Sequence, residues 1–253
     1  MRLRAENLSK RFGGVAAVQE VGFDLEPGVV HSIIGPNGAG KTTLLNLLSG
    51  IYRADSGRIV LDDTELSGRA AHEFAIAGVG RTFQNLQVFF NMTALENVMV
   101  GRWQHERCSL ASALLRLPRV VREERRCREA AYELLEFVGL AMWAARDADS
   151  MPYGALKRLE IARALAARPK FLLLDEPAAG LNPTETLDID RLIREVAARG
   201  ITVVLVEHNM KLVMEVSQRV LVLDHGRKLA EGEPAAVSQD PQVIEAYLGV
   251  EHA

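Results

Sequence analysis

Short apolar runs, rich in leucine and β-branched residues and bounded by turn residues, recur along the chain. They lie at Val29–Ile34, Phe171–Leu174, Ile201–Val206 and Val220–Leu223. Nearly continuous apolar runs of this length are typical of strands that are buried on both faces, as in parallel sheets. The runs therefore predict the strands of a mostly parallel sheet.

Helical patterns alternate with these runs. They lie at Lys41–Ser49, Leu156–Ala167, Pro183–Ala198 and Met210–Val216. Strands that alternate with helices indicate an α/β fold of the doubly wound type. We therefore expect an α/β core.

Two regions break this alternation. Arg2–Phe23 and Arg58–Asp62 alternate between apolar and polar residues, which predicts a small antiparallel β subdomain. Residues 85–153 lack strand runs but contain the capping-box pattern Thr93–Glu96 and a long helical pattern at Val120–Val138. We expect one domain over residues 1–253, in which residues 1–84 and 160–253 form the core with the β subdomain and residues 85–159 form an inserted helical subdomain.

Composition places the chain among ordinary globular proteins. It is 48% hydrophobic and 25% charged, with a formal net charge of -3. The basic residues of Arg122–Arg128 are interleaved with glutamates, which favours a solvated helix face over a nucleic-acid site. Cys108 and Cys127 have no metal-ligand spacing, and no apolar stretch approaches the roughly 18 residues of a membrane span or forms a signal peptide.

The segment between the first apolar run and the first helical pattern fits the phosphate-binding pattern G-x-x-x-x-G-K-[ST]. Its candidate nucleotide-binding residues are Gly35, Pro36, Asn37, Gly38, Ala39, Gly40, Lys41, Thr42 and Thr43. Glycines let the backbone curve round phosphates with its N–H groups pointing inward, and the next helix adds its positive N-terminal end. Lys41 would neutralise phosphates and Thr42 would offer a hydroxyl to Mg²⁺. The strand before the segment and the helix after it favour a P-loop NTPase core that binds ATP over a chance glycine-rich turn.

Further polar side chains follow the apolar runs. Asp175 and Glu176 directly follow Phe171–Leu174, at the strand end where open parallel sheets bind their ligands. Asp175 fits a partner of Mg²⁺, and Glu176 fits the base that accepts a proton from the attacking water; standing alone, both acids would equally suit a helix cap. His208 follows Ile201–Val206 and is predicted to contact the γ-phosphate.

Gln84 completes the candidate site. It is a neutral side chain that can ligate Mg²⁺ or orient water, and it lies at the border between the core and the helical insertion. The catalytic candidates are therefore Glu176, His208 and Gln84, and the metal candidates are Thr42, Gln84 and Asp175.

The order of these elements resembles that of the ABC transporter ATPases, over nearly the whole chain. The shared order is an aromatic residue, the P-loop, a Gln loop, a glycine-bearing signature, the adjacent acids, a D-loop and a switch histidine. The resemblance implies that Phe12 stacks on adenine, that Gln84 couples Mg²⁺ to the helical lobe and that Glu176 is the general base. It also implies that His208 is the switch residue and that Gly154 contacts the nucleotide of a partner ATPase.

Several stretches resemble more narrowly the ATPases of branched-chain amino acid importers, in particular the larger one. They are Gly80–Asn85, Arg158–Arg163, Asp175–Pro183, Glu207–Met214 and Ala246–Gly249. The resemblance implies a dimer with a second ATPase, a heterodimer or a homodimer, docked under two permease subunits that an external solute-binding protein supplies. It also implies a peripheral position on the cytoplasmic face of the inner membrane.

The signature departs from the family pattern Leu-Ser-Gly-Gly-Gln. This chain has Met151–Ala155 there, so the serine hydroxyl and the glutamine amide are missing, and Asn182 stands where the D-loop usually has Asp. We therefore hypothesise an asymmetric heterodimer in which this chain's own P-loop site hydrolyses ATP and the opposite site does so poorly.

Other functions share parts of these patterns. Urea or short amides are alternative solutes, because solute choice belongs to the permease and the binding protein. A soluble ABC-type ATPase would usually fuse two cassettes or insert a coiled coil, and a P-loop kinase would not explain Gly154, Glu176 and His208 together. A silent regulatory module is motivated only by the altered signature.

Overall fold

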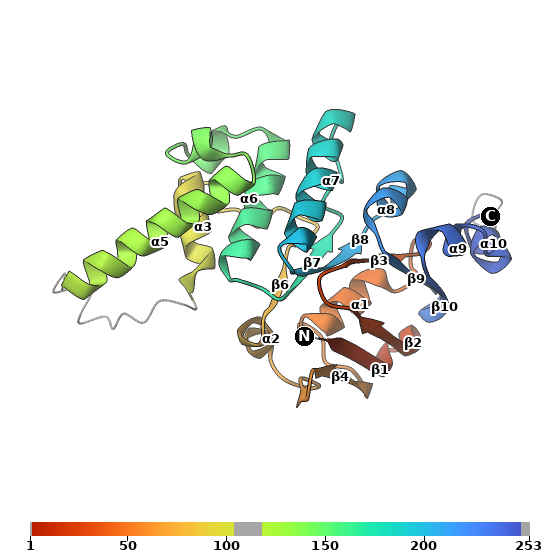
Figure 1. Cartoon of the computed structure of the whole chain (residues 1–253). Coiled ribbons are helices and arrows are strands. Elements are labelled where there is room, and N and C mark those ends of the chain that lie inside the picture. Colours follow the sequence, from red (N-terminus) through yellow and green to blue (C-terminus); the bar gives the residue numbers. More distant parts are fainter. Residues whose placement is uncertain (1, 104–117, 249–253) are drawn as a thin grey trace. The chain divides into compact units, whose positions relative to one another are not determined.

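The computed structural model describes residues 2–103 and 118–248. Cys108 and Gly249, which enter the sequence analysis, lie outside these ranges. The chain divides into two compact units, of which unit 1 comprises Met1–Gln84 and Lys170–Ala253 and unit 2 comprises Asn85–Pro169 (Figure 1).

A six-stranded sheet forms the centre of unit 1, in the order β10-β9-β3-β8-β7-β6. Its strands are β3 (Val30–Ile34), β6 (Val79–Arg81), β7 (Phe171–Asp175), β8 (Thr202–Val206), β9 (Arg219–Asp224) and β10 (Arg227–Gly232). All neighbours from β9 to β6 pair in parallel, whereas β10 runs antiparallel to β9. Every residue of β3, β7 and β8 is buried, which explains their apolar sequences. The predicted mostly parallel sheet is confirmed.

A second, antiparallel sheet belongs to the same unit, in the order β2-β1-β4-β5. Its strands are β1 (Leu3–Phe12), β2 (Val15–Leu25), β4 (Ser56–Leu61) and β5 (Thr64–Glu65). Buried residues of β1, such as Leu3 and Ala5, alternate with more exposed ones, as expected for a sheet with one covered face. The predicted antiparallel β layer is confirmed.

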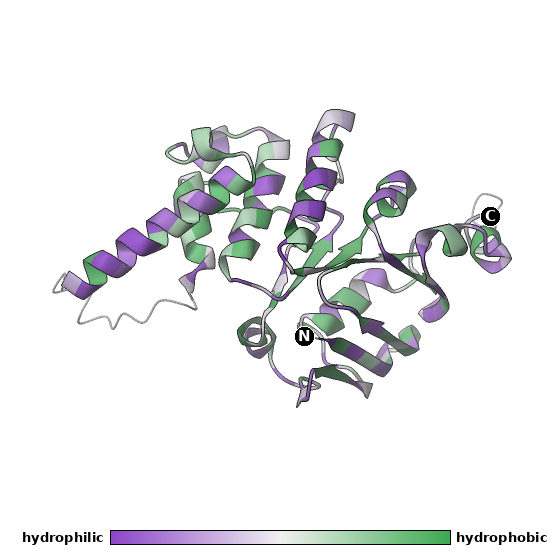
Figure 2. Ribbon diagram, in the orientation of Figure 1, coloured by the Kyte–Doolittle hydropathy of each residue, from purple (hydrophilic) through white to green (hydrophobic). Residues whose placement is uncertain are grey.

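Helix α1 joins the two sheets of unit 1 through their cores. The helices of this unit are α1 (Lys41–Leu48), α2 (Ala71–Ala77), α7 (Pro183–Ala198), α8 (Met210–Val216), α9 (Pro234–Ser238) and α10 (Pro241–Leu248). Leu44, Leu45, Leu47 and Leu48 of α1 are fully buried in one cluster that contains residues of both sheets. Hydrophobic colour is correspondingly dense on α1 and the central strands (Figure 2). The start of α1, which carries the P-loop lysine, is therefore rigidly supported.

Unit 2 is helical in the part that the structure describes. It contains α3 (Ala94–Gly101), α5 (Pro118–Phe137), the 3-10 turns η2 (Ala141–Trp143) and η3 (Ala148–Ser150), and α6 (Tyr153–Ala166). Helix α3 approaches α6 so closely that a Cβ at Gly101 would overlap the Arg163 carbonyl. The Thr93 capping box is confirmed, because the Thr93 hydroxyl accepts the Glu96 N–H at 3.2 Å.

Unit 2 ends at Pro169, whereas the helical subdomain predicted from the sequence ends at residue 159, inside α6. Helix α6 packs as one piece because Leu159, Ala162 and Ala166 are all buried. A boundary within this helix would cut through its packed face.

The charged residues of α5 lie on its exposed side. Arg125 and Glu129 form an exposed ion pair at 3.2 Å, and the buried stripe consists of Cys127, Ala131 and Leu135. This spacing places the buried residues on a single face of the helix. Over residues 2–103 and 118–248, no helix is both long and apolar enough to cross a bilayer, and no cluster of acidic, histidine and cysteine side chains is arranged to hold a metal.

Candidate functional site

The P-loop curves between β3 and α1 with its glycines in conformations that other residues rarely adopt. The φ angles of Gly35, Gly38 and Gly40 are 149°, 81° and 99°. A Cβ on Gly35 would overlap the Leu223 carbonyl, and one on Gly40 would overlap the Ala17 carbonyl. Glycine is therefore required at these two positions by close backbone contact as well as by φ.

Lys41 begins α1 and points back along the P-loop. Its ammonium donates hydrogen bonds to the carbonyls of Gly35, at 2.7 Å, and Pro36, at 2.9 Å. Burial lowers the pKa of Lys41, and the carboxylates of Glu176 and Asp175 oppose this shift. The lysine is thus a buried cation held over the loop by carbonyls that phosphate oxygens can replace.

A cavity of about 520 Å³ opens above the P-loop. It gathers most of the predicted site residues from distant parts of unit 1, namely Asn37, Gly38, Ala39, Gly40, Lys41, Thr42, Thr43, Gln84, Glu176 and His208. Gly35, Pro36 and Asp175 are not part of this lining. The exposed His225, in the turn between β9 and β10, also lines the cavity and was not predicted.

Glu176 is contacted by both of the other catalytic candidates. His208 Nε2 lies 3.0 Å from Glu176 Oε1, and the Gln84 amide donates to Glu176 Oε2 at 3.1 Å. Glu176 itself has a φ of 49°, and its N–H is bonded to the Val206 carbonyl, so its backbone is fixed at the ends of two strands. The arrangement orients a carboxylate towards the P-loop cavity, which suits a general base.

Asp175 ends β7 and is almost fully buried. Its Oδ2 forms an ion pair with Arg81 at 3.0 Å, and the same guanidinium donates to Asn46 Oδ1 at 2.6 Å and Ser49 Oγ at 2.9 Å. Burial lowers the pKa of Arg81, and the charge of Asp175 counters that effect. Arg81 thereby ties β7 to helix α1.

The role of Arg81 was not predicted from the sequence. One signal was available, because Arg81 is a charged residue within a short strand that leads to Gln84. A charge buried in a strand needs a partner of opposite charge.

Glu207 was also missed, although it stands at a strand's carboxyl end like Asp175. It is 5% exposed. Its carboxylate accepts the Ala178 N–H at 2.8 Å and the His208 N–H at 3.0 Å. It therefore fixes the loop after Glu176 against the loop that carries His208.

Phe12 lies at the end of β1 and is 44% exposed, so it is not a core residue. Its ring packs edge-on against Tyr52 with a centroid distance of 5.2 Å, and Lys10 lies 5.7 Å from its centroid. Phe12 does not line the cavity described above. An exposed aromatic face suits base stacking, but its use for adenine stays a prediction.

Gly154 belongs to unit 2, in the first turn of α6. It is buried, and Tyr153 beside it is 44% exposed. The N-cap residue of α6 is Pro152, and no side chain caps this end of the helix. The altered signature thus retains backbone N–H groups at the helix start but has no serine hydroxyl there.

The residues present fit Mg²⁺. The Thr42 hydroxyl, the Gln84 amide oxygen and the Asp175 carboxylate are hard oxygen donors, the kind that this cation prefers. Thr42 and Gln84 both line the P-loop cavity, and Asp175 ends β7 immediately before Glu176 in the sequence.

Two family models match parts of this chain. The model described as ABC transporter matches residues 18–179. The chain belongs to the ABC transporter family. A second model, described as branched-chain amino acid ATP-binding cassette transporter, matches residues 227–253 of this ABC ATPase.

Individual relatives match the ABC ATPase along almost its whole length. The high-affinity branched-chain amino acid transport ATP-binding protein BraF of Pseudomonas aeruginosa is 46% identical, over 98% of this chain and 97% of BraF. The corresponding protein LivG of Escherichia coli is 44% identical, over 98% of this chain and 97% of LivG.

Solved structures agree with these matches. The ADP conformation of MJ1267, an ATP-binding cassette of an ABC transporter, has a TM-score of 0.86 and 36% identity, over 98% of this chain and 99% of that one. A dimeric post-hydrolysis structure of the cassette MJ0796 bound to ADP and Pi has a TM-score of 0.77 and 25% identity, over 92% and 98%. The ABC ATPase fold predicted from the sequence is confirmed.

Proposed function

We propose that this ABC ATPase binds and hydrolyses ATP as the nucleotide-binding subunit of an importer of branched-chain amino acids. The observation that carries the proposal is the convergence of Gln84, Glu176 and His208 on the cavity that also contains Lys41. The relatives BraF and LivG, which are named as branched-chain amino acid transport ATP-binding proteins, support the solute class.

In the proposed chemistry, the P-loop N–H groups and Lys41 bind the phosphates of ATP. Glu176 accepts the proton of the attacking water, and His208, bonded to Glu176 at 3.0 Å, keeps the carboxylate and the water aligned. Phe12 stacks on adenine. Each of these steps uses a side chain that unit 1 already orients.

Thr42, Asp175 and Gln84 would hold Mg²⁺. When bound, this ion neutralises charge on the β- and γ-phosphates. Arg81 keeps the Asp175 carboxylate in place at the end of β7, through the 3.0 Å ion pair.

The proposed assembly follows from the same relationship. Two ATPase subunits would close ATP between them, docked on two permease subunits at the cytoplasmic face of the inner membrane, with a solute-binding protein outside. The dimeric cassette MJ0796 bound to ADP and Pi supports pairing of two cassettes.

Reconstitution tests the proposed transport. The ATPase would be co-purified with its permease and solute-binding subunits, placed in proteoliposomes and supplied with labelled leucine or urea. Uptake of leucine that requires ATP and is abolished by Lys41→Ala is expected. Uptake of urea but not of leucine would indicate an importer of urea or short amides instead. ATP turnover without any membrane partner would favour a soluble ATPase.

The signature motivates asymmetry between the two ATP sites. Met151–Ala155 lack the serine and glutamine that bind a partner's ATP, and losing a hydrogen bond to a charged group costs about 1.5–3 kcal/mol. The site on this chain's own P-loop would therefore hydrolyse ATP with the partner's signature, while the partner's site would be slow. Asn182, which replaces the usual Asp of the D-loop, is a second departure from the family pattern in this chain.

The asymmetry is tested by measuring ATP hydrolysis of the assembled complex with only one of its two ATP sites mutated. Glu176→Gln in this chain is expected to remove nearly all ATP hydrolysis, and the matching change in the partner is expected to leave most of it. Equal activity in the two variants would refute the asymmetry.

A further inference from the structure

Two of the catalytic candidates, Glu176 and His208, stand on separate loops at the ends of neighbouring strands. Strands β7 and β8 pair in parallel with Asp175 opposite Val206, so both loops begin at the same edge of the sheet. The Glu176 N–H donates to the Val206 carbonyl at 2.9 Å, which extends the pairing by one bond. Both strands have ended at this point, so the relative position of the two loops depends on other contacts.

Glu207 supplies two such contacts. Its Oε1 accepts the Ala178 N–H at 2.8 Å, and its Oε2 accepts the His208 N–H at 3.0 Å. The residue is buried, so these bonds are shielded from water. Both oxygens therefore accept from backbone N–H groups, an arrangement that suits a carboxylate but not an amide, which has only one oxygen.

The contacts of Glu207 close a ring around the catalytic pair. On one side, Ala178 lies two residues after Glu176, in a turn that the Ala179 N–H closes on the Glu176 carbonyl at 3.2 Å. On the other side, the imidazole of His208 reaches Glu176, with Nε2 at 3.0 Å from Oε1. Displacing the Glu207 carboxylate would therefore release both of the loops that set the distance between the imidazole and the catalytic carboxylate.

We propose that Glu207 is a positioning residue for ATP hydrolysis, whose buried carboxylate holds His208 and Glu176 in the mutual orientation that activates water. The inference rests on the proposed function and adds a residue that does not line the P-loop cavity. Hydrogen bonds from N–H groups to an ionised carboxylate are stronger than those between neutral groups, which suits a fixed support.

The expected consequence concerns chemistry more than nucleotide binding. Glu207→Gln conserves the volume of the side chain, but its NH₂ group would face either the Ala178 N–H or the His208 N–H, so one of the two bonds is lost. A displacement of about 1 Å can cost roughly 100-fold in rate, and we expect kcat to fall by about 10- to 100-fold. The Kd for ADP should stay close to the wild-type value, because neither bond involves Lys41 or the P-loop.

ATPase kinetics of the assembled complex and calorimetric titration of the full-length subunit with ADP test the proposal. Glu207→Asp is a second variant, which keeps two acceptor oxygens and should therefore lose less of kcat than Glu207→Gln. If Glu207 only filled space, Glu207→Gln would be the milder change, because glutamine has the volume of glutamate.

Asn209→Ala is the matched control. Asn209 follows His208 on the same loop, and its side chain caps α8 by accepting the Leu212 N–H at 3.2 Å. The substitution removes this cap and leaves both Glu207 bonds in place. We expect a kcat close to that of the wild type.

Three results would overturn the proposal. They are a wild-type kcat in Glu207→Gln, a larger loss of kcat in Glu207→Asp than in Glu207→Gln, and an equal loss in Asn209→Ala. If Glu207→Gln does not fold, a reduced kcat with normal ADP affinity in Glu207→Asp supports the proposal, and a wild-type kcat overturns it. Absence of ATP hydrolysis by the wild-type complex would instead count against the proposed function, so the two failures are distinguishable.

Discussion

Single residues of the candidate site either line the cavity above the P-loop or support a residue that does. The spacing Gly35–Thr42 and the adjacent acids at a strand end indicate the candidate nucleotide site, because both depend on local chemistry. Arg81 and Glu207 do not stand out, because their importance comes from contacts with Asp175 and Ala178, far away in sequence. Local patterns reveal groups that face a ligand more readily than the side chains that support those groups.

The Arg81–Asp175 pair gives a prediction about stability. Arg81→Met removes the charge that compensates the buried Asp175 carboxylate, and breaking a buried pair costs about 3–5 kcal/mol. Urea unfolding should show a loss of this size. Arg58→Met, which breaks the exposed pair with Glu6, is the control and should cost about 0–1 kcal/mol. Equal losses in the two variants would contradict the importance of the buried pair.

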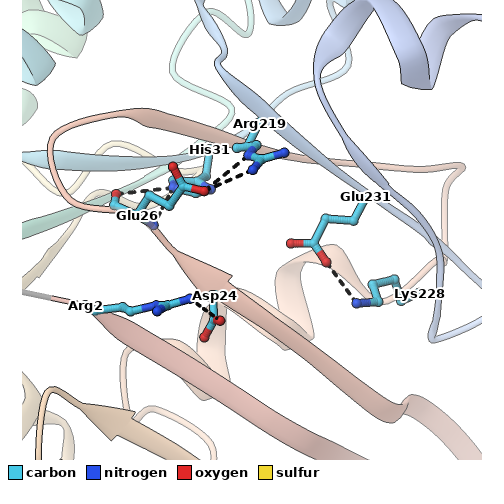
Figure 3. Close-up of polar contacts among 7 residues, drawn as sticks. All are labelled: Arg2, Asp24, Glu26, His31, Arg219, Lys228 and Glu231. Atoms are coloured by element: carbon cyan, nitrogen blue, oxygen red, sulfur yellow. Dashed lines mark hydrogen bonds and ion pairs between the residues drawn. The ribbon is translucent and has the colours of Figure 1, made fainter.

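His31 gives a prediction about pH. This buried histidine of β3 accepts the Glu26 N–H at 2.8 Å, beside the Glu26–Arg219 ion pair, with Glu231 nearby (Figure 3). Burial lowers the His31 pKa below 6.5 despite the neighbouring glutamates. As pH falls through about 6.5, the unfolded chain therefore takes up the proton first, and the free energy of unfolding decreases.

The variant His31→Gln keeps a hydrogen-bond acceptor and does not titrate. Its unfolding free energy should fall less than that of the wild type between pH 7.5 and pH 5.5, as measured by urea unfolding at both values. Parallel losses in the two proteins would assign the pH dependence to other groups.

Among the strands of the central sheet, those buried inside it could be predicted from their apolar sequences, whereas the edge strands could not. The apolar runs identified β3, β7, β8 and β9, since these strands lie inside the sheet. The edge strands β6 and β10 were not predicted, because β6 spans only Val79–Arg81 and β10 carries the charged Arg227, Lys228 and Glu231. The start of α6 was placed too late because Pro152 serves as its N-cap in place of a polar residue.

Helix α7 gives a prediction about the D-loop. The Asn182 side chain accepts the Glu185 N–H at 3.0 Å, and Glu185 accepts the Asn182 N–H at 3.1 Å. Asn182→Ala should cost about 0.5–2 kcal/mol in urea unfolding, whereas Asn182→Asp should be nearly neutral, because Asn and Asp cap helices equally well. A large loss in the Asp variant would mean that this residue has a role other than capping.

At the scale of the whole molecule, the chain combines two units with different tasks. Unit 1 contains the P-loop, both acids and His208, whereas unit 2 contains the signature around Gly154. In the proposed dimer, unit 1 of one subunit and the signature of the other would together form a nucleotide site, so each chain would contribute both parts. The break in the alternation of strands and helices predicted a helical subdomain, but not the packing of α10 onto the end of β3, since Val243 and Ile34 are brought together only by the fold.

ATP turnover by the assembled transporter with Glu176→Gln in this chain tests the central claim most directly. The account predicts that the variant still binds ATP, because the P-loop and Lys41 are intact. It also predicts that hydrolysis falls by about 100- to 10,000-fold, the usual contribution of a positioned general base. Turnover at the wild-type rate, with ATP bound normally, would contradict the assignment of Glu176 and with it the proposed ATPase site.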